Sequence, residues 1–314
     1  MSDYEIIVDC SCDLSAELRE RYDIADYLRG VLYFPDGHEE LISLDWEGMT
    51  PEEYFSSMKN KKTFYKTAAP PVGEITDKFE RYLSQGKDIL CICISSGLSA
   101  CYHDASMVAA DLMKKYPERK IVCIDSLRYS TALGLLNISV AQKRLDGATL
   151  EEAVAYAEAE KVKIHQMGAM DDLFFLQKVG RVSGGKAFFG NLIGLNIMAD
   201  FNEKGVSEVI GKVKGRKDAF KAIIEYIRAL AVNPEEQIFF IGQSLRKEDA
   251  LRLKELVEKE LHPKEVIIND IGLSCGANIG PGLTAVYFKG EPATEGLVKE
   301  RETAERISAA LKNK

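Results

Sequence analysis

The sequence predicts an α/β protein of two domains: an N-terminal α/β domain built on a parallel sheet and a C-terminal α/β or α+β domain built on a mixed sheet. Three observations lead to this prediction. Short apolar runs alternate with amphipathic stretches in the first half, a second series of such runs begins near residue 160, and two of the later runs are joined by a turn-like segment. With 314 residues and 46% hydrophobic content, the chain can bury one large or two modest cores.

The first half contains three runs typical of strands buried on both faces, YEIIVD at 4–9, DILCICI at 88–94 and KIVCID at 120–125. Apolar residues recur at helical spacing along one side of 98–116, and capping boxes at 50–53 and 149–152 mark two further helix starts. Strand, helix and strand in this order imply a parallel sheet with right-handed crossovers. We assign this domain to residues 1–160.

The second half, assigned to residues 161–314, contains the runs KVKIHQMGAM, NIMADF, GVSEVIGKVKG, EQIFFIGQ, EVIINDI and LTAVYFKG. The second and third of these runs are joined by the turn-like segment 202–205, so we expect them to pair antiparallel. The last helix, about 303–312, could pack back on the first domain. The cleft between the two domains is the natural place for a ligand.

Composition and charge exclude several classes of protein. The formal net charge of −8 argues against sequence-independent binding to nucleic acid, which needs a basic face. No run approaches the roughly 18 apolar residues of a membrane span, and the start MSDYEIIVDC lacks the features of a signal peptide, so we expect a cytoplasmic protein without integral membrane insertion. The seven cysteines suit reduced, buried thiols better than disulfides, and no histidine lies at ligand spacing to complete a metal site.

The strongest local signal is the serine turn Ile94–Ser99, where a buried strand runs through Ser95, Ser96 and a glycine into a helix. Ligands of open parallel sheets bind at the carboxyl ends of strands, where helix amino termini attract anions. A carboxylate or a phosphate would therefore suit this turn. The alternative, a catalytic serine with a partner such as His103, lacks the G-x-S-x-G spacing of a nucleophile elbow.

Other segments are ambiguous by themselves. Thr67 lies in a proline-containing loop, Gly276–Gly282 forms a glycine-proline turn, and the loop Gly180–Lys186 is basic but lacks the spacing of a nucleotide P-loop, so ATP binding is not expected. The apolar run that follows is normally a core helix, although it also suits the walls of an apolar tunnel. Its candidate tunnel residues are Phe188, Phe189, Leu192, Ile193 and Leu195.

In this order, the segments resemble the DegV family of bacterial fatty-acid-binding proteins, the lipid-carrying subunits of fatty acid kinase. The resemblance runs along nearly the whole chain. The segments that carry it are VDCSCDL, the Thr67 loop, ISSGLSACYHDA, IDSLRYSTALGLL, LFFLQKVGRVSGGKAFFGNLIGLNIM, KVKGRKDAF and GANIGPG.

This resemblance implies a long-chain fatty acid buried between the domains, with its carboxylate held by Thr67, Ser95 and Ser96 and with Asn278 at a position where the family usually has histidine. Arg181 corresponds to the arginine of the family's polar network near the head group. The family pattern further implies that a separate ATP-dependent kinase subunit phosphorylates the bound acid, so that this chain is itself no enzyme and needs no cofactor.

Two departures from the family pattern concern this site, because Ala68 and Ala69 replace a serine and a glutamine, and Ala100 replaces a glycine. Two alternatives to the fatty-acid carrier stay open from the sequence. One is a serine-dependent acyl hydrolase, and the other is a regulatory module that binds another small carboxylate. The missing nucleophile elbow counts against the first, and the long apolar tract counts against the second.

Overall fold

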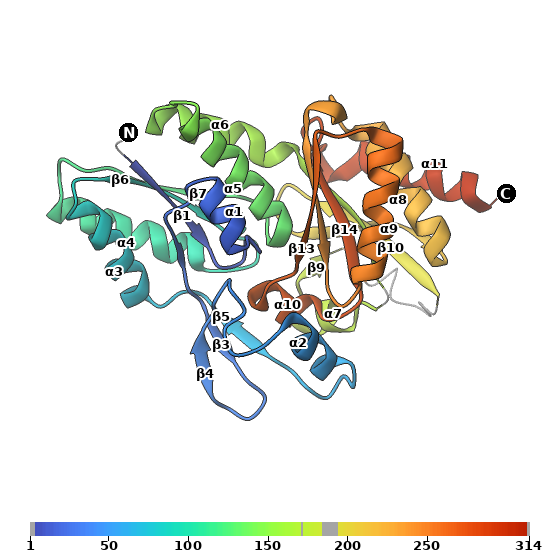
Figure 1. The fold of residues 1–314 in the computed structure, drawn as a ribbon, viewed down its shortest axis with the longest axis horizontal. Helices are drawn as coiled ribbons and strands as arrows, with labels where there is room; N and C mark the ends of the chain where they lie inside the picture. Colours follow the sequence, from blue (N-terminus) through green and yellow to red (C-terminus); the bar gives the residue numbers. More distant parts are fainter. Residues whose placement is uncertain (1–3, 171, 184–193, 313–314) are drawn as a thin grey trace.

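A parallel sheet organises the first half of the protein, as predicted. The computed structural model describes residues 4–170, 172–183 and 194–312. The sheet has the order β2-β1-β6-β7, and all its neighbours are parallel. Its strands are β1 (Tyr4–Asp9), β2 (Asp26–Leu28), β6 (Asp88–Cys93) and β7 (Ile121–Asp125). Helices lie on both faces of this sheet (Figure 1). They are α1 (Ala16–Arg21), α3 (Val72–Leu83), α4 (Cys101–Lys115), α5 (Ser130–Leu145) and α6 (Leu150–Glu160).

Local signals place most helix starts correctly. The side chains of Thr50 and Thr149 each cap a helix, α2 (Pro51–Met58) and α6, in a reciprocal capping box. The expected helix at 98–116 begins later, however, at Cys101. The amides of Leu98 and Ser99 both donate to the carbonyl of Ser95, which closes a tight turn before the helix. The serine turn is therefore separated from the helix terminus that was expected to follow it directly.

A small lobe between β2 and α3 was not predicted. Its antiparallel sheet has the order β4-β3-β5, formed by β3 (Val31–Tyr33), β4 (Glu39–Leu41) and β5 (Lys66–Ala68). Helix α2 packs beside it through the buried rings of Tyr54 and Phe55, and the lobe projects below the two main sheets in Figure 1. The strands are only three residues long, too short for a clear alternation of apolar and polar residues.

The second half contains two further sheets. The mixed sheet β13-β12-β14-β8 combines one parallel pair with two antiparallel pairs, as predicted. Its strands are β8 (Ile164–Met170), β12 (Ile238–Gln243), β13 (Glu265–Asp270) and β14 (Leu283–Lys289). The second sheet, β10-β11-β9, contains the predicted antiparallel pair and consists of β9 (Val182–Ser183), β10 (Leu195–Phe201) and β11 (Ser207–Lys214).

The remaining helices cover these sheets and join the two halves. The α-helices are α7 (Phe174–Val179), α8 (Arg216–Leu230), α9 (Lys247–Leu261), α10 (Leu273–Ile279) and α11 (Val298–Lys312). Short 3₁₀ helices occupy η1 (Lys161–Lys163), η2 (Pro234–Glu236) and η3 (Glu295–Leu297). Helix α11 packs on β11 and α8, so the expectation that the last helix could return to the first domain is wrong. Its buried residues Thr303, Ala304 and Ile307 form the stripe that makes this contact.

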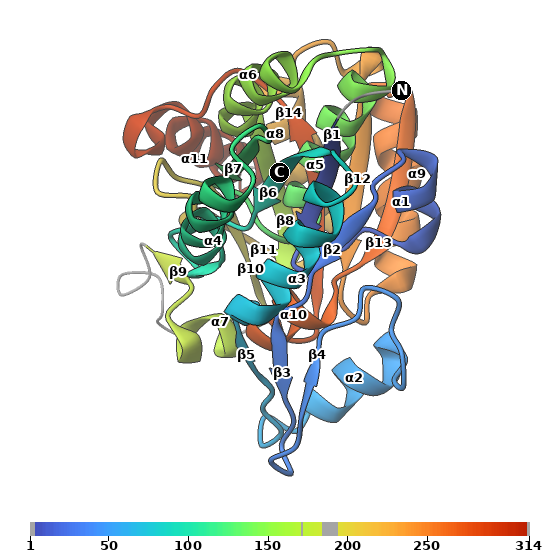
Figure 2. The same cartoon turned by 90° about the vertical axis from the view of Figure 1, so that its left-hand side faces the viewer.

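Helix α5 connects the two halves of the molecule. It packs against α6 of the first half and against β8, β12 and β14 of the second, and Figure 2 shows it among these elements. Its residues from Ser130 to Ile138 are all buried, which explains the weak helical periodicity of this segment. The boundary near residue 160 stays a prediction, although the strands of the parallel and the mixed sheet fall on opposite sides of it.

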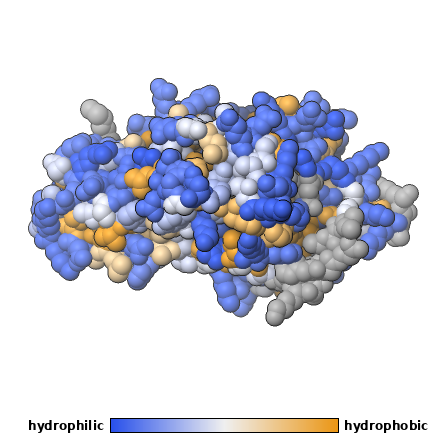
Figure 3. Space-filling model, turned by 90° about the horizontal axis from the view of Figure 1, so that it is seen from below, coloured by the Kyte–Doolittle hydropathy of each residue, from blue (hydrophilic) through white to orange (hydrophobic). Residues whose placement is uncertain are grey.

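The face of the molecule seen from below is mostly hydrophilic (Figure 3). Seen from below, apolar residues form patches of limited size among charged ones (Figure 3). None of the helices within the described ranges is both long and apolar enough to span a bilayer.

Candidate functional site

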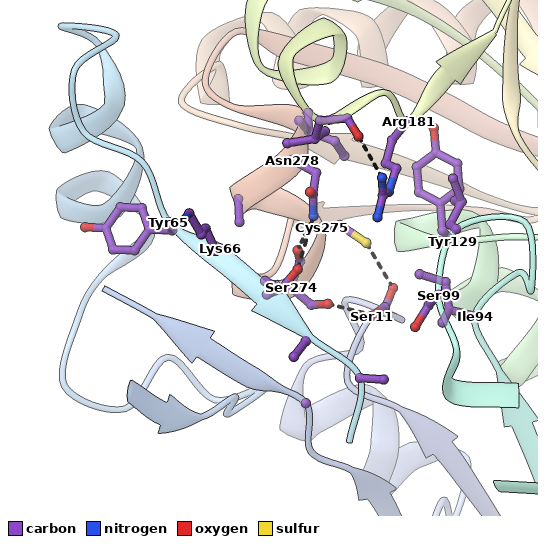
Figure 4. A pocket seen from close by; sticks show the side chains of 18 of the residues that line it. Ser11, Tyr65, Lys66, Ile94, Ser99, Tyr129, Arg181, Ser274, Cys275 and Asn278 are labelled. Carbon is purple, nitrogen blue, oxygen red and sulfur yellow. Dashed lines mark hydrogen bonds between the residues drawn. The ribbon is translucent and has the colours of Figure 1, made fainter. Parts of the chain in front are cut away.

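The main cavity lies where the small lobe meets the two halves of the protein. Its volume is about 660 Å³, within the range of small-molecule sites. The lobe contributes residues 64–70, the loops after β1 and β6 contribute residues at the carboxyl ends of their strands, and α7 and α10 close the other side (Figure 4). The cavity therefore lies at the sheet edge where ligands of parallel α/β sheets bind.

Neutral hydrogen-bonding groups gather on one wall of the cavity. Asn278 on α10 donates from Nδ2 to the hydroxyl of Thr67 on β5 at 3.5 Å and to the carbonyl of Ser274 at 3.1 Å. The hydroxyls of Ser11 and Ser274 lie 2.7 Å apart. In this arrangement the Thr67 oxygen accepts, so its own hydrogen is available to a ligand. The same wall thus offers hydroxyl donors from residues that are far apart in the sequence.

The thiols and the nearest carboxylate of this wall have structural partners. Burial raises the pKa of Cys10 and of Cys275 well above the usual thiol value, so both stay neutral near pH 7. Asp9 accepts hydrogen bonds from the amides of Ser11 at 2.7 Å and Ile94 at 3.4 Å, and it ties the loops after β1 and β6 together. These groups shape the wall, and hydroxyl and amide donors remain for binding.

A basic rim surrounds the opening, formed by Lys66, Lys178 and Arg181. All three are exposed. Lys178 lies over the ring of Phe64, and Arg181 donates to the carbonyl of Val179 at 2.7 Å. This concentration of positive charge is notable in a chain with a formal net charge of −8, and it favours anions near the opening.

Ser95 and Ser96, which the sequence assigned to a carboxylate, do not line the cavity. The hydroxyl of Ser95 accepts from the amide of Gly97 at 3.2 Å and donates to the carbonyl of Lys204 at 3.4 Å. The hydroxyl of Ser96 donates to Asp125 at 2.5 Å. Both hydroxyls are thus occupied on the side of the turn that faces β7 and the β10–β11 turn.

Ser99, three residues after Ser96, lines the cavity instead. The tight turn closed by the Ser95 carbonyl explains why Ser99 and not Ser96 reaches the cavity, because it changes the direction of the chain before α4 begins. Sequence reasoning also missed Ser11 and Ser274, whose proximity depends on the contact between α10 and the loop after β1. Only the three-dimensional arrangement brings these two serines together.

Gly97, two residues after Ser95, allows the close packing of this turn. A Cβ atom at Gly97 would overlap the Lys204 carbonyl, and one at Gly205 would overlap the Ser95 hydroxyl. Gly205 also has a φ of +68°, a conformation that favours glycine. The serine turn of the first half and the β10–β11 turn of the second are therefore in direct contact through their glycines.

The predicted tail residues cannot be placed at a cavity. Phe188, Phe189, Leu192 and Ile193 lie outside the described residues. Leu195 is half-buried on β10, but it lines neither the main cavity nor the apolar pocket described next.

An apolar pocket instead lies between the sheet faces of the second half. Its volume is about 60 Å³, and it shares Tyr129, Leu176 and Ile279 with the main cavity. Most of its other wall residues are apolar side chains on β8, β10, β11 and β14 and around α7, including Met170, Leu173, Ile197, Val209, Leu283 and Ala285. The polar wall and the apolar pocket are therefore neighbours that meet at three shared residues.

Comparisons with known proteins agree with this architecture. A DegV domain-containing protein of Clostridium perfringens is 30% identical over 291 residues, which cover 93% of this chain and 99% of the relative. A fatty-acid-binding DegV family protein of Thermus thermophilus has a similar structure, with a TM-score of 0.81 and 23% identity over 92% of this chain and 99% of that one. A stearic-acid-binding protein of Eubacterium ventriosum gives a TM-score of 0.79 with 22% identity, covering 91% of this chain and 98% of that one.

The match to a protein-family model is equally extensive. The model described as "Uncharacterised protein, DegV family" matches residues 3–291. This range includes the small lobe and every described strand, and it ends before α11. The chain belongs to the DegV family.

Proposed function

We propose that this chain binds one long-chain fatty acid, with the carboxylate in the main cavity and the tail in the adjoining apolar pocket. The observation that carries the proposal is the position of Tyr129, Leu176 and Ile279, which line both spaces. A ligand with a polar head and an apolar tail matches this pair of surfaces. The solved relatives whose names describe bound fatty acids support the same ligand class.

The two spaces would contribute differently to binding. Each buried methylene contributes about 0.8 kcal/mol, so a sixteen-carbon tail supplies on the order of 10 kcal/mol before the cost of ordering is subtracted. The carboxylate loses hydration on entering the cavity, and the hydroxyls of Thr67 and Ser99 would replace it, with Asn278 holding Thr67 so that its hydrogen faces the ligand. The apolar pocket must widen to accept a long tail, because its present volume of about 60 Å³ holds only a small part of one.

Native mass spectrometry of freshly purified protein, followed by lipid extraction, tests this proposal. We expect one fatty acid per chain and uptake of added palmitate or oleate by delipidated protein. Binding should strengthen with chain length, which distinguishes this function from a module for small carboxylates. Equal affinity for acetate and palmitate, or no uptake of either, would contradict the proposal.

We further propose that an ATP-dependent kinase subunit phosphorylates the bound carboxylate, which places the carrier in the cytoplasm where ATP is available. The basic rim of Lys66, Lys178 and Arg181 supports this step, since it would attract the nucleotide phosphates or an acidic face of the partner. Acyl phosphate, trapped with hydroxylamine, should form only when the chain, fatty acid, ATP and a candidate kinase subunit are combined. Formation by the chain alone would contradict the division of labour.

The hydrolase alternative is disfavoured by the serine turn. Ser96 donates to Asp125, and among the described residues no hydrogen bond joins a histidine to Ser95 or Ser96. The general base that a serine nucleophile needs is therefore not in place. We expect purified protein to leave acyl esters intact. Ester turnover that disappears in Ser96→Ala would restore the hydrolase.

A further inference from the structure

Among the side chains with polar groups that line the otherwise apolar pocket, three are joined by hydrogen bonds. Tyr129 precedes α5, Gln166 lies on β8, and Ser207 begins β11. The hydroxyls of Tyr129 and Ser207 lie 2.5 Å apart, and the Gln166 side-chain amide donates to the same Ser207 hydroxyl. All three residues are at least nine-tenths buried and line the pocket. We call this group the polar triad.

The polar triad has more hydrogen-bond donors than its internal contacts use. Only one hydrogen can occupy the line between the Tyr129 and Ser207 oxygens, and the Gln166 amide carries two hydrogens. If both hydroxyls share one hydrogen bond and the amide supplies another, at least one hydroxyl or amide hydrogen remains. Tyr129 also makes a side-chain hydrogen bond with Gln166. The three side chains carry four donor hydrogens in all, so one remains even when each pair of them shares a hydrogen bond. This surplus persists whichever hydroxyl donates.

The spare donor hydrogen of the polar triad lies in a largely apolar part of the pocket. Of the other wall residues, Met170, Ile197, Val209, Leu283 and Ala285 offer no side-chain acceptor oxygen. Tyr287 also lines the pocket, and its hydroxyl is hydrogen-bonded to Ser130. A buried donor without a partner costs free energy, and a saturated hydrocarbon tail would leave it unpaired. An oxygen atom on the tail would accept the spare hydrogen. The pocket is thus better matched to an oxygen-bearing chain than to a plain one.

We propose that the polar triad selects acyl chains that carry an oxygen, as a hydroxyl or a keto group, in the interior of the chain. Tyr129, Gln166 and Ser207 are then specificity-determining residues of the tail pocket. This inference rests on the proposed function, because it requires the tail to enter this pocket. It adds the chemical class of the tail, which the carboxylate site does not determine.

The position of Tyr129 sets where along the chain the oxygen should be. Tyr129 lines both the main cavity and the apolar pocket, so the polar triad lies beyond the head-group wall of Thr67 and Asn278. An oxygen on the carbon next to the carboxylate would stay near that wall. A mid-chain oxygen would reach the triad. The acid hydroxylated at mid-chain and the acid hydroxylated next to the carboxylate have the same composition, so a difference in their affinities reports the position of the oxygen alone.

Calorimetric titration of delipidated protein tests the proposal with stearate, a mid-chain hydroxystearate, a mid-chain ketostearate and the isomer hydroxylated next to the carboxylate. A neutral hydrogen bond corresponds to a preference of about two- to tenfold. We expect the mid-chain hydroxy and keto acids to bind more tightly than stearate by this factor, and the other isomer to show no such preference. The keto acid is informative because its chain oxygen accepts a hydrogen bond but cannot donate one. Tighter binding of this acid would therefore show that the polar triad donates.

Two variants identify the source of the preference. The triple variant Tyr129→Phe, Gln166→Leu, Ser207→Ala removes every hydrogen-bond donor of the polar triad, so the ratio of mid-chain hydroxystearate to stearate affinity should fall toward one. Ser183→Ala is the control, since Ser183 lies on β9 beside Ser207 but lines neither cavity, and it should keep the wild-type ratio. Thermal melts verify that each variant is folded.

The outcomes separate the two proposals. If no acid binds, the proposed function fails. If all acids bind and wild type prefers stearate or shows no preference, a water molecule rather than the ligand satisfies the polar triad, and the tail-class proposal is overturned. A ratio that survives in the triple variant also overturns it, because the preference would then come from another part of the pocket.

Discussion

The two ends of the site are built in opposite ways. The head-group end collects hydroxyl and amide groups from the small lobe, from the loops after β1 and β6 and from α10, so its donors come from segments distant in sequence. The tail end is formed largely by strand faces of β8, β10, β11 and β14 that belong to the core of the second half. If the proposed fatty acid binds here, the loops would orient its carboxylate and the packed sheets would supply most of its affinity.

Filling the tail end should have the largest effect on binding. Ala199 lines the apolar pocket from β10 and is half-buried, so Ala199→Phe would place a ring in the space needed by the tail. Excluding about five methylenes removes about 4 kcal/mol, roughly a thousandfold in affinity for palmitate. An eight-carbon acid should lose much less. Ala110→Phe, at an exposed position of α4, is the matched control. Equal losses for both acids would argue against a tail in this pocket.

At the head-group end, Thr67→Val should have the next largest effect. The substitution keeps the shape but removes a hydroxyl donor, and a hydrogen bond to a charged group is worth about 1.5–3 kcal/mol. Affinity for palmitate should fall by about ten- to a hundredfold, with a smaller loss for hexadecanol, which lacks the charge. Thr63→Val is the control, because Thr63 belongs to the same lobe but not to the cavity wall. Parallel losses for acid and alcohol would show that Thr67 does not contact the carboxylate.

A buried charge pair behind the tail pocket should make the second half sensitive to pH. Both ring nitrogens of His165 face acceptors, with Nδ1 2.6 Å from Asp200 and Nε2 2.8 Å from the carbonyl of Glu291. Burial by itself lowers the pKa of His165, but Asp200 and the carbonyl outweigh burial and the nearby Arg128, so the pKa is raised. Tyr226, whose pKa burial raises well above its usual value, also donates to Asp200 and stays neutral.

The sign of this effect follows from the raised pKa. The stabilisation from charged His165 is complete below the unfolded-state pKa of about 6.5 and is lost as pH rises through the higher folded-state pKa. The free energy of unfolding, measured in denaturant, should therefore decline above about pH 6.5. His165→Gln should lose this decline and about 1–3 kcal/mol at pH 6. His103→Gln, on the exposed side of α4, should retain the wild-type pH profile. A flat wild-type profile would contradict a charged His165.

The smallest effect is expected at the serine turn. Because Ser96 donates to Asp125 and does not line the cavity, Ser96→Ala should change palmitate affinity by less than about twofold, within the range of peripheral substitutions. Ser99→Ala removes a hydroxyl from the cavity wall and should weaken binding more. If titration shows a larger loss for Ser96→Ala than for Ser99→Ala, the carboxylate site would have to include Ser96, as the sequence first indicated.

The sequence was informative about the head-group end and much less so about the tail. Thr67, Asn278 and Arg181 were predicted from motif resemblance, and all three line the cavity. Ser95 and Ser96 do not line this cavity, because a sequence shows where hydroxyls occur but not which way a turn directs them.

The apolar pocket escaped prediction for a different reason. Ile197 on β10 and Leu283 on β14 follow the same patterns as ordinary core residues, and only the sheet arrangement leaves a space between them. The parallel sheet was predictable because its buried strands are distinct, whereas the short strands of the lobe were not.

The contact between the serine turn at Gly97 and the β10–β11 turn at Gly205 also bears on how quickly a ligand can exchange. These turns join the first half to the second, and each glycine packs against the neighbouring turn with no room for a side chain. Rotation of the halves away from each other would have to break this contact together with the packing of α5. Entry and release should therefore proceed through small movements at the opening of the cavity. Dissociation rates should then respond to the bulk of the rim side chains more than to solution conditions that loosen the contact between the halves.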